Sequence, residues 1–176
     1  MITPDHPQLM ARYNRWQNES LIAAADGLTD EERRADGGAF FKSIHGTLCH
    51  ILWADRIWMH RLAGWEKPEE SGIAASMGEG RTWSEYQTLR RKVDQRLIDW
   101  ADALTDADLS GTLTWYSGAT GAEKTKPKWL LVTHLFNHQT HHRGQVHALL
   151  TRMGARPADT DIPFMPNEFN AEEKSA

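Results

Sequence analysis

Four stretches of the chain carry apolar residues at the spacing of an amphipathic α-helix, three to four positions apart. These stretches cover about residues 5–26, 41–62, 83–103 and 126–153. Four helices of this length, joined by modest connections, are typical of a four-helix bundle. The pattern therefore predicts an all-α fold, in which each helix turns its apolar face toward a shared core.

Residues that begin and end helices support these boundaries. Thr3 or Asp5 is placed to cap the first helix, and Ser43 the second. Thr82 and Glu85 have the spacing of a capping box at the start of the third. Gly64 and Gly154 follow the second and fourth helices, and Pro127 lies near the start of the fourth.

The connections between these helices differ in kind. The similar segments "GLTDEER" and "ALTDADL" follow the first and third helices, either as a trace of an internal repeat or as two uses of one turn chemistry. Residues 64–81 have the composition of a long surface loop, and residues 110–125 predict a hairpin-like insert before the last helix. After residue 155 we expect an irregular tail, with "NAEEKSA" frayed at the end.

Length and charge narrow the class of protein. A chain of 176 residues fits one domain, residues 1–176, large enough to bury a core. Its net charge of −4 argues against nucleic-acid binding, and no apolar run is long enough for a membrane span. The start of the chain has no signal-peptide pattern, and a single cysteine, Cys49, fits a reducing cytoplasm. Eight tryptophans predict a core rich in large aromatic side chains.

Histidines are concentrated on the fourth helix, where "LFNHQTHHRGQVHALL" holds four of the nine. His134, His138 and His142 recur every four residues and so share one helix face with leucines. Buried imidazoles need partners for both nitrogens, and a divalent metal is an economical shared partner. An HxxxH pair alone is a weak indication. Because Gln139 follows His138, the metalloprotease HExxH motif and its general base are absent.

The second helix supplies a further candidate. His50 shares its face with core residues, whereas His45 and His60 are expected at the surface. Cys49 lies about 100° away from His50 around the helix, too far to serve the same metal. Packing of the second helix on the fourth would bring His50 opposite His138 and His142, and Trp53 or Trp58 would line the site.

Three motifs together resemble the DinB-like family, which is named for damage-inducible proteins. They are "YNRW" at residues 13–16, "HILWADRIW" at 50–58, and the NHxxxHRGQ pattern at 137–145. The resemblance implies a four-helix bundle, usually dimeric, in which one histidine of the second helix and two of the fourth bind a metal. Carried over by position, the ligands are His50, His138 and His142. The family name does not imply DNA binding.

Neighbouring residues receive other roles. We expect His134 and His141 to flank the site and Gln145 to bond a ligand imidazole or a metal-bound water. Arg143 is expected to pack or to form an ion pair. The resemblance supplies no protein nucleophile or general base, so the catalytic residues stay open.

The expected activity also comes from the resemblance. Its wider superfamily includes enzymes that use low-molecular-weight thiols such as bacillithiol and mycothiol. We therefore expect a cytoplasmic, homodimeric, metal-dependent transferase that joins a small thiol to a small-molecule substrate in detoxification or stress response. The alternatives are a metal-dependent hydrolase and a non-catalytic metal-binding protein. Zinc or nickel is the expected metal, with iron and manganese as alternatives.

Overall fold

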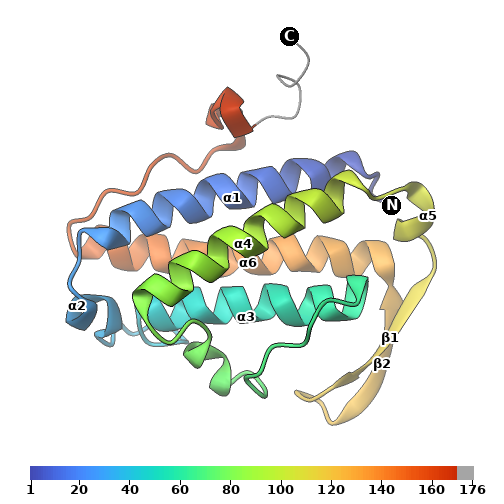
Figure 1. The fold of residues 1–176 in the computed structure, drawn as a ribbon, viewed down its shortest axis with the longest axis horizontal. Coiled ribbons are helices and arrows are strands. Elements are labelled where there is room, and N and C mark those ends of the chain that lie inside the picture. Colours follow the sequence, from blue (N-terminus) through green and yellow to red (C-terminus); the bar gives the residue numbers. More distant parts are fainter. Residues whose placement is uncertain (170–176) are drawn as a thin grey trace.

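Four long helices lie side by side in the computed structural model, which describes residues 1–169 (Figure 1). They are α1 (Asp5–Asp26), α3 (Ile44–Ala63), α4 (Trp83–Asp102) and α6 (Lys128–Arg152). Each long helix begins and ends within three residues of its predicted bounds. The predicted four-helix bundle is thereby confirmed.

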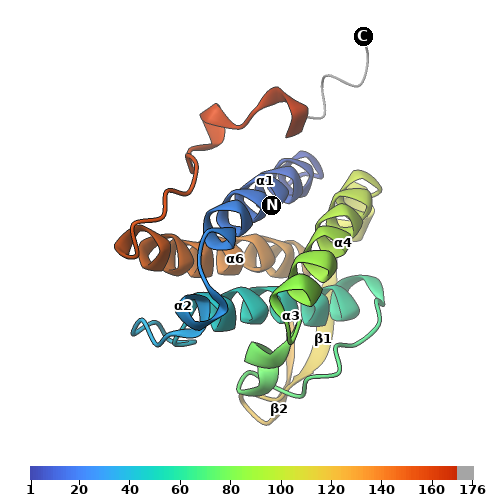
Figure 2. The same ribbon diagram turned by 60° about the vertical axis from the view of Figure 1, so that its left-hand side comes forward.

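The four helices surround one core. α1 packs on α4 and α6, and α3 packs on the same two helices, so α1 and α3 lie diagonally across the bundle (Figure 2). Leu48, Leu97, Leu135 and Leu150 are among the fully buried side chains. Each such leucine contributes about 1.5–3 kcal/mol through burial. Apolar packing therefore supplies most of the stability of this bundle.

Helix capping follows the sequence prediction at both ends of α3 and at the start of α4, but not at the start of α1. The Ser43 side chain accepts from the Gly46 amide, Thr82 and Glu85 form a capping box, and Gly64 ends α3 with a positive φ of 68°. The predicted cap at Thr3 or Asp5 is wrong, because Pro4 occupies the N-cap position of α1 and no side chain caps this helix. The Thr3 hydroxyl instead contacts the Asp5 carboxylate at 3.4 Å.

The two similar segments after α1 and α4 fold as matching short helices. In α2 (Asp30–Arg34), Thr29 and Glu32 form a capping box. In α5 (Asp106–Leu109), Thr105 and Asp108 form the same pairing. The likeness of these sequences thus has a local chemical cause, a capping box that starts each short helix.

The predicted hairpin is present between α5 and α6. β1 (Thr112–Ser117) pairs antiparallel with β2 (Ala122–Pro127), and Gly121 adopts a positive φ in the turn. In Figure 1 this hairpin projects from the end of the bundle where α6 begins. It therefore adds side chains next to the C-terminal end of α3.

The segment predicted as a loop over residues 64–81 contains a 3-10 turn, η1 (Ala75–Gly78), which packs on α3. Ser76 within it is fully buried. Two contacts hold the segment against α3: Trp53 Nε1 donates to the Glu70 carbonyl at 2.9 Å, and Arg56 pairs with Glu79. Part of the predicted surface loop is therefore a fixed structural element.

The tail after α6 covers one side of α1. It includes two 3-10 turns, η2 (Ile162–Phe164) and η3 (Asn167–Phe169), and Met165 packs against Tyr13 and Trp16. Tyr13 donates its hydroxyl to the Thr160 carbonyl at 2.8 Å. The predicted fraying of "NAEEKSA" lies outside the described residues.

Fewer of the eight tryptophans are buried than the sequence predicts. Only Trp16 and Trp53 are buried, and the other six keep partial exposure. The apolar core is built mainly from aliphatic side chains and alanines of the four long helices. The prediction of a core rich in large aromatic side chains is confirmed only in part, because Tyr86 and Phe136 are fully buried in the main core, whereas four tryptophans pack against its edge.

A buried polar network crosses the bundle. Its members are Asn14, Asn18, Asp55, Arg90, Asp94, Gln139 and Arg143, each at most 4% exposed. Arg90 contacts Asp55 at 2.6 Å and Asp94 at 2.9 Å, and Asn18 donates to Asp94 at 2.9 Å. Gln139 bonds to Asp55, and Arg143 bonds to Asn14. The network joins all four long helices through hydrogen bonds and ion pairs.

Within residues 1–169, no helix combines the length and the apolar character needed to cross a membrane.

Candidate metal centre

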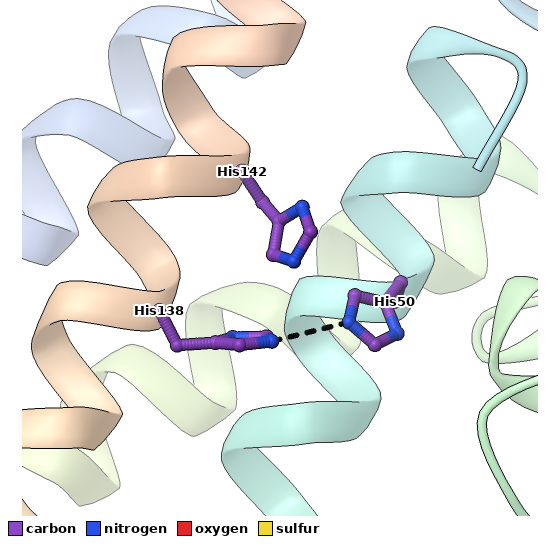
Figure 3. Close-up of side chains that lie close together, drawn as sticks. All are labelled: His50, His138 and His142. Atoms are coloured by element: carbon purple, nitrogen blue, oxygen red, sulfur yellow. Dashed lines mark hydrogen bonds between the residues drawn. The ribbon is translucent and has the colours of Figure 1, made fainter. Parts of the chain in front are cut away.

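His50 of α3 and His138 and His142 of α6 turn their imidazoles toward one another (Figure 3). His50 Nε2 lies 3.3 Å from His138 Nε2, and one nitrogen from each ring falls within 4.8 Å of the others. The i,i+4 spacing on α6 places His138 and His142 one turn apart on the same side. The structure thus brings together the three residues that the sequence predicts as ligands.

The His50 ring is fixed by Ser76, which lies in the η1 turn. The Ser76 hydroxyl donates to the Ile73 carbonyl at 2.6 Å and lies 2.8 Å from His50 Nδ1. Since its own proton is engaged, Ser76 accepts a hydrogen bond from His50 Nδ1–H. This leaves His50 Nε2 unprotonated and directed at the other two imidazoles.

Gln145 has the same effect on His142. Its Oε1 lies 2.9 Å from His142 Nδ1, and its Nε2 lies 3.3 Å from Nε2 of the exposed His141. An amide oxygen can only accept, so His142 carries its proton on Nδ1 and leaves Nε2 free. The predicted contact of Gln145 with a ligand imidazole is present, and His141 flanks the site.

Aromatic rings enclose His50. Phe41 stacks on the His50 imidazole with centroids 3.7 Å apart and meets His142 edge-on at 5.3 Å. The Trp53 ring is stacked beside the His50 imidazole with centroids 6.0 Å apart, so Trp53 lines the site as the sequence predicts. Phe41 is buried and comes from the segment that precedes α3, so it covers a side of the site that sequence periodicity did not address.

The imidazoles are held in the neutral form. Burial, followed by the proximity of His142, lowers the pKa of His50 to about 3. Burial and the neighbouring histidines lower the pKa of His138 to about 3 as well, and burial lowers the pKa of His142. Neutral imidazole is the form that binds metal ions.

These donors fit a divalent transition metal. Two nitrogens bound tetrahedrally to one ion at 2.0–2.1 Å lie about 3.3 Å from each other. His50 and His138 already show that separation. Ser76 and Gln145 also supply the outer hydrogen bonds that usually orient ligating histidines. Among residues 1–169, this is the one group of three such donors close enough to share an ion.

Comparison with known proteins agrees with this architecture. The family model described as "DinB family" matches residues 1–174. The chain belongs to the DinB family. It is 26% identical over 152 residues to "Protein DinB" of Bacillus subtilis (strain 168), covering 85% of this chain and 87% of that relative. A crystal structure of a DinB-like protein from Bacillus cereus ATCC 10987 shares the fold, with a TM-score of 0.60 and 21% identity over 82% of this chain and 91% of that one.

Ser76→Ala is expected to weaken metal binding about 10- to 100-fold, because His50 loses the acceptor that orients it. A zinc titration against a chromophoric chelator measures this change. Ser110→Ala is the matched control, since the Ser110 hydroxyl also donates to a carbonyl three residues earlier but lies beside α5. Equal affinity in the two variants would show that Ser76 does not support the site.

The sequence also makes predictions for three further histidines, His134, His60 and His45. His134 lies one turn before His138 with ring centroids 5.7 Å apart, so it flanks the triad without joining it. His60 is exposed, as predicted. His45 is only 2% exposed, and the prediction of a surface residue is wrong. It packs beside Trp83 and Tyr86, because α4 covers this side of α3 near its start.

The buried His45 makes stability depend on pH. Burial lowers the pKa of His45 from 6.5 to about 4. Between pH 6.5 and 4, His45 is protonated in the unfolded chain but not in the folded chain. The free energy of unfolding therefore decreases as the pH drops through this range. His45→Gln should reduce this slope by up to about 1.4 kcal/mol per pH unit. Urea unfolding of metal-free protein across this range measures it, and an unchanged slope would contradict the assignment.

A groove of about 700 Å³ lies apart from the histidines. Arg56, Glu79, Arg81 and Lys92 are among its lining residues, and no member of the triad is. This groove is open and carries charges of both signs, whereas the nitrogen donors of the three histidines converge on one point. Convergence of polar groups is the better indication of a functional site.

Proposed function

We propose that His50, His138 and His142 bind one divalent transition metal ion. The observation that carries the proposal is the convergence of three neutral imidazoles, two of which have their Nδ1 protons engaged by Ser76 and Gln145. Zinc and nickel are the leading candidates, because all-nitrogen ligation suits both ions. Iron and manganese are the alternatives.

We propose further that the site is catalytic and that the protein is a metal-dependent transferase for a low-molecular-weight thiol. Three protein donors leave coordination positions open, as in catalytic zinc sites, whereas structural sites are closed by four. A bound metal would supply Lewis acidity that favours the thiolate over the thiol. The resemblance to a family whose wider superfamily includes thiol-dependent enzymes supports this choice of substrate.

The residues of the chain would hold and shield the reacting groups. The thiolate sulfur forms a bond to an electrophilic carbon, the leaving group departs with the bonding electron pair, and the thiol proton passes to solvent. Phe41 and Trp53 restrict water on the His50 side. The buried imidazoles stay unprotonated at neutral pH and so do not compete for the thiol proton.

Metal analysis and thiol binding test the two steps separately. Protein reconstituted with zinc or nickel should hold about one ion per chain, and less than roughly a tenth would overturn the metal site. Cobalt-substituted protein should then develop sulfur-to-cobalt charge-transfer absorption when a small thiol is added. Metal binding without any thiol response, together with no transfer to an electrophilic substrate, would leave a non-catalytic metal-binding protein.

A homodimer is the proposed assembly, as the family resemblance implies. Four partly exposed tryptophans support it, since large apolar side chains on a surface are typical of interfaces. They are Trp65, Trp83, Trp100 and Trp129. Light scattering at tens of micromolar should give about twice the chain mass of 20.0 kDa. A monomer mass across that range would reject the dimer.

A further inference from the structure

A row of aromatic and cationic side chains extends from the histidine triad toward the hairpin. His134 follows His138 at 5.7 Å between ring centroids, and Trp58 meets His134 edge-on at 5.1 Å. Trp115 of β1 lies 5.4 Å from Trp58. Arg61 ends the row, with its Cζ 4.7 Å from the Trp58 ring centroid and 6.0 Å from that of Trp115.

All five residues of this row, His138, His134, Trp58, Trp115 and Arg61, keep partial exposure. A small molecule can therefore reach each of them from solvent. The row combines residues of α3, α6 and β1, and in Figure 1 β1 lies at the end of the bundle where α3 ends and α6 begins. The hairpin thus contributes a wall that the four helices alone do not provide.

Arg61 has no carboxylate partner within residues 1–169. Its neighbour Arg56 pairs with Glu79, and Arg96, which stacks on Trp65 at 4.0 Å, pairs with Glu66 at 3.1 Å. Burial lowers the pKa of Arg61 from its ordinary 12.5, so its charge lacks full compensation by solvent. Two tryptophan rings orient this guanidinium while its N–H donors make no hydrogen bond to residues 1–169.

We propose that Arg61, Trp58 and Trp115 form a subsite that binds a carboxylate group of the thiol substrate while its sulfur lies at the histidine triad. The subsite rests on the proposed thiol function and specifies its substrate class, an anionic thiol. A guanidinium fork matches a carboxylate in geometry and charge. The two indole faces contact the apolar body of the molecule between its charged end and its sulfur.

The spacing of the row defines the length of this substrate. Arg61 follows His50 by three turns of α3, about 16 Å along the helix axis. Successive members of the row, Arg61, Trp58, His134 and His138, are 4.7, 5.1 and 5.7 Å apart, so the carboxylate and the sulfur are separated by many bonds. A thiol of two or three carbons is too short to occupy both ends.

A series of mercapto acids and matched mercapto alcohols tests the subsite on cobalt-substituted protein. The probes are 3-mercaptopropionate, 6-mercaptohexanoate, 8-mercaptooctanoate and 11-mercaptoundecanoate, each against the alcohol of equal length. Charge-transfer absorption reports sulfur binding without any need for turnover. We expect the acid to bind about tenfold more tightly than its alcohol at one of the longer lengths, and to show no advantage at the shortest.

Arg61→Gln should abolish this advantage while leaving the affinity for alcohols unchanged. Arg96→Gln is the matched control, because Arg96 also stacks on a tryptophan but belongs to α4 and already has a carboxylate partner. The control should retain the preference for the acid.

Three outcomes would count against the subsite. An acid advantage that survives in Arg61→Gln overturns it, as does equal binding of acids and alcohols at every length. A lower oligomeric mass of Arg61→Gln with unchanged acid preference would assign Arg61 to a contact between copies and also overturn it. Failure of even the alcohols to produce absorption would instead refute the proposed thiol function.

Discussion

His138→Ala is expected to abolish stoichiometric metal binding while the bundle stays folded. The substitution removes the nitrogen that lies 3.3 Å from His50 Nε2 and leaves two donors, so affinity should fall by more than about a hundredfold. His138 is partly exposed and lies outside the apolar core, which is why the helices should persist. Isothermal titration with zinc measures the first effect, and circular dichroism the second.

His134→Ala is the control for this experiment. His134 lies one turn earlier on the same helix and is also half-buried, but its ring nitrogens are not part of the converging group. It should retain about one ion per chain. Equal losses in the two variants would refute the ligand set, and so would wild-type affinity in His138→Ala.

Metal removal distinguishes a catalytic from a structural ion. Chelator-treated protein at pH 7.5 should remain helical, because four long helices already bury a shared core. Its melting temperature should be lower, since a bound ion stabilises the native state by mass action. A collapse of helicity on chelation would make the ion structural and remove the main support for thiol transfer.

Asp55→Ala is expected to cost about 3–5 kcal/mol in the free energy of unfolding, the second large effect. Asp55 is completely buried, accepts from Gln139, and pairs with Arg90 at 2.6 Å. Its loss leaves a guanidinium that is 1% exposed with one carboxylate partner, Asp94, in place of two. Urea unfolding of metal-free protein measures the change without interference from metal binding.

Asp102→Ala is the surface counterpart. Asp102 pairs with Arg12 at 2.8 Å, but its side chain is 42% exposed, so the expected cost is below about 1 kcal/mol. The triple variant Asp55→Leu, Arg90→Met and Asp94→Leu should recover part of the lost stability, because it removes Arg90 together with both of its buried carboxylate partners. Equal small costs at Asp55 and Asp102 would show that the buried network contributes little.

The sequence predicts the long helices well because their boundaries depend on local chemistry. Ser43, the pair Thr82 and Glu85, and Gly64 act within one turn of themselves. The ligand set was also within reach of the sequence, since i,i+4 spacing fixes the relation of His138 to His142. The position of His50 opposite them came from the family resemblance and from helix packing.

The inward face of α1 was the main failure of periodicity. The apolar positions Leu9, Tyr13, Trp16 and Leu21 have the spacing of a core face, but of these only Leu21 belongs to the main core. Leu9 is 40% exposed, and the tail packs against Tyr13 and Trp16. The face that turns inward carries Asn14 and Asn18, which belong to the buried polar network. A pattern of apolar positions cannot reveal polar residues whose partners lie on other helices.

Ser76 was missed for a related reason. Its segment has no apolar period, and a serine among glycines and alanines has the composition of a surface loop. What fixes it is tertiary: the Arg56–Glu79 pair and the Trp53 hydrogen bond hold the segment against α3. Contacts between residues this far apart in the chain cannot be recognised from the local sequence pattern.

Along α6, each of the two predicted ligands is followed directly by a member of the buried polar network. Gln139 follows His138, and Arg143 follows His142. A rotation of α6 by one residue, about 100°, would displace the imidazoles only by breaking bonds to Asp55 and Asn14 on two other helices. Folding therefore gathers the three predicted donor atoms in advance, so that binding of an ion there would require little reorganisation of the bundle.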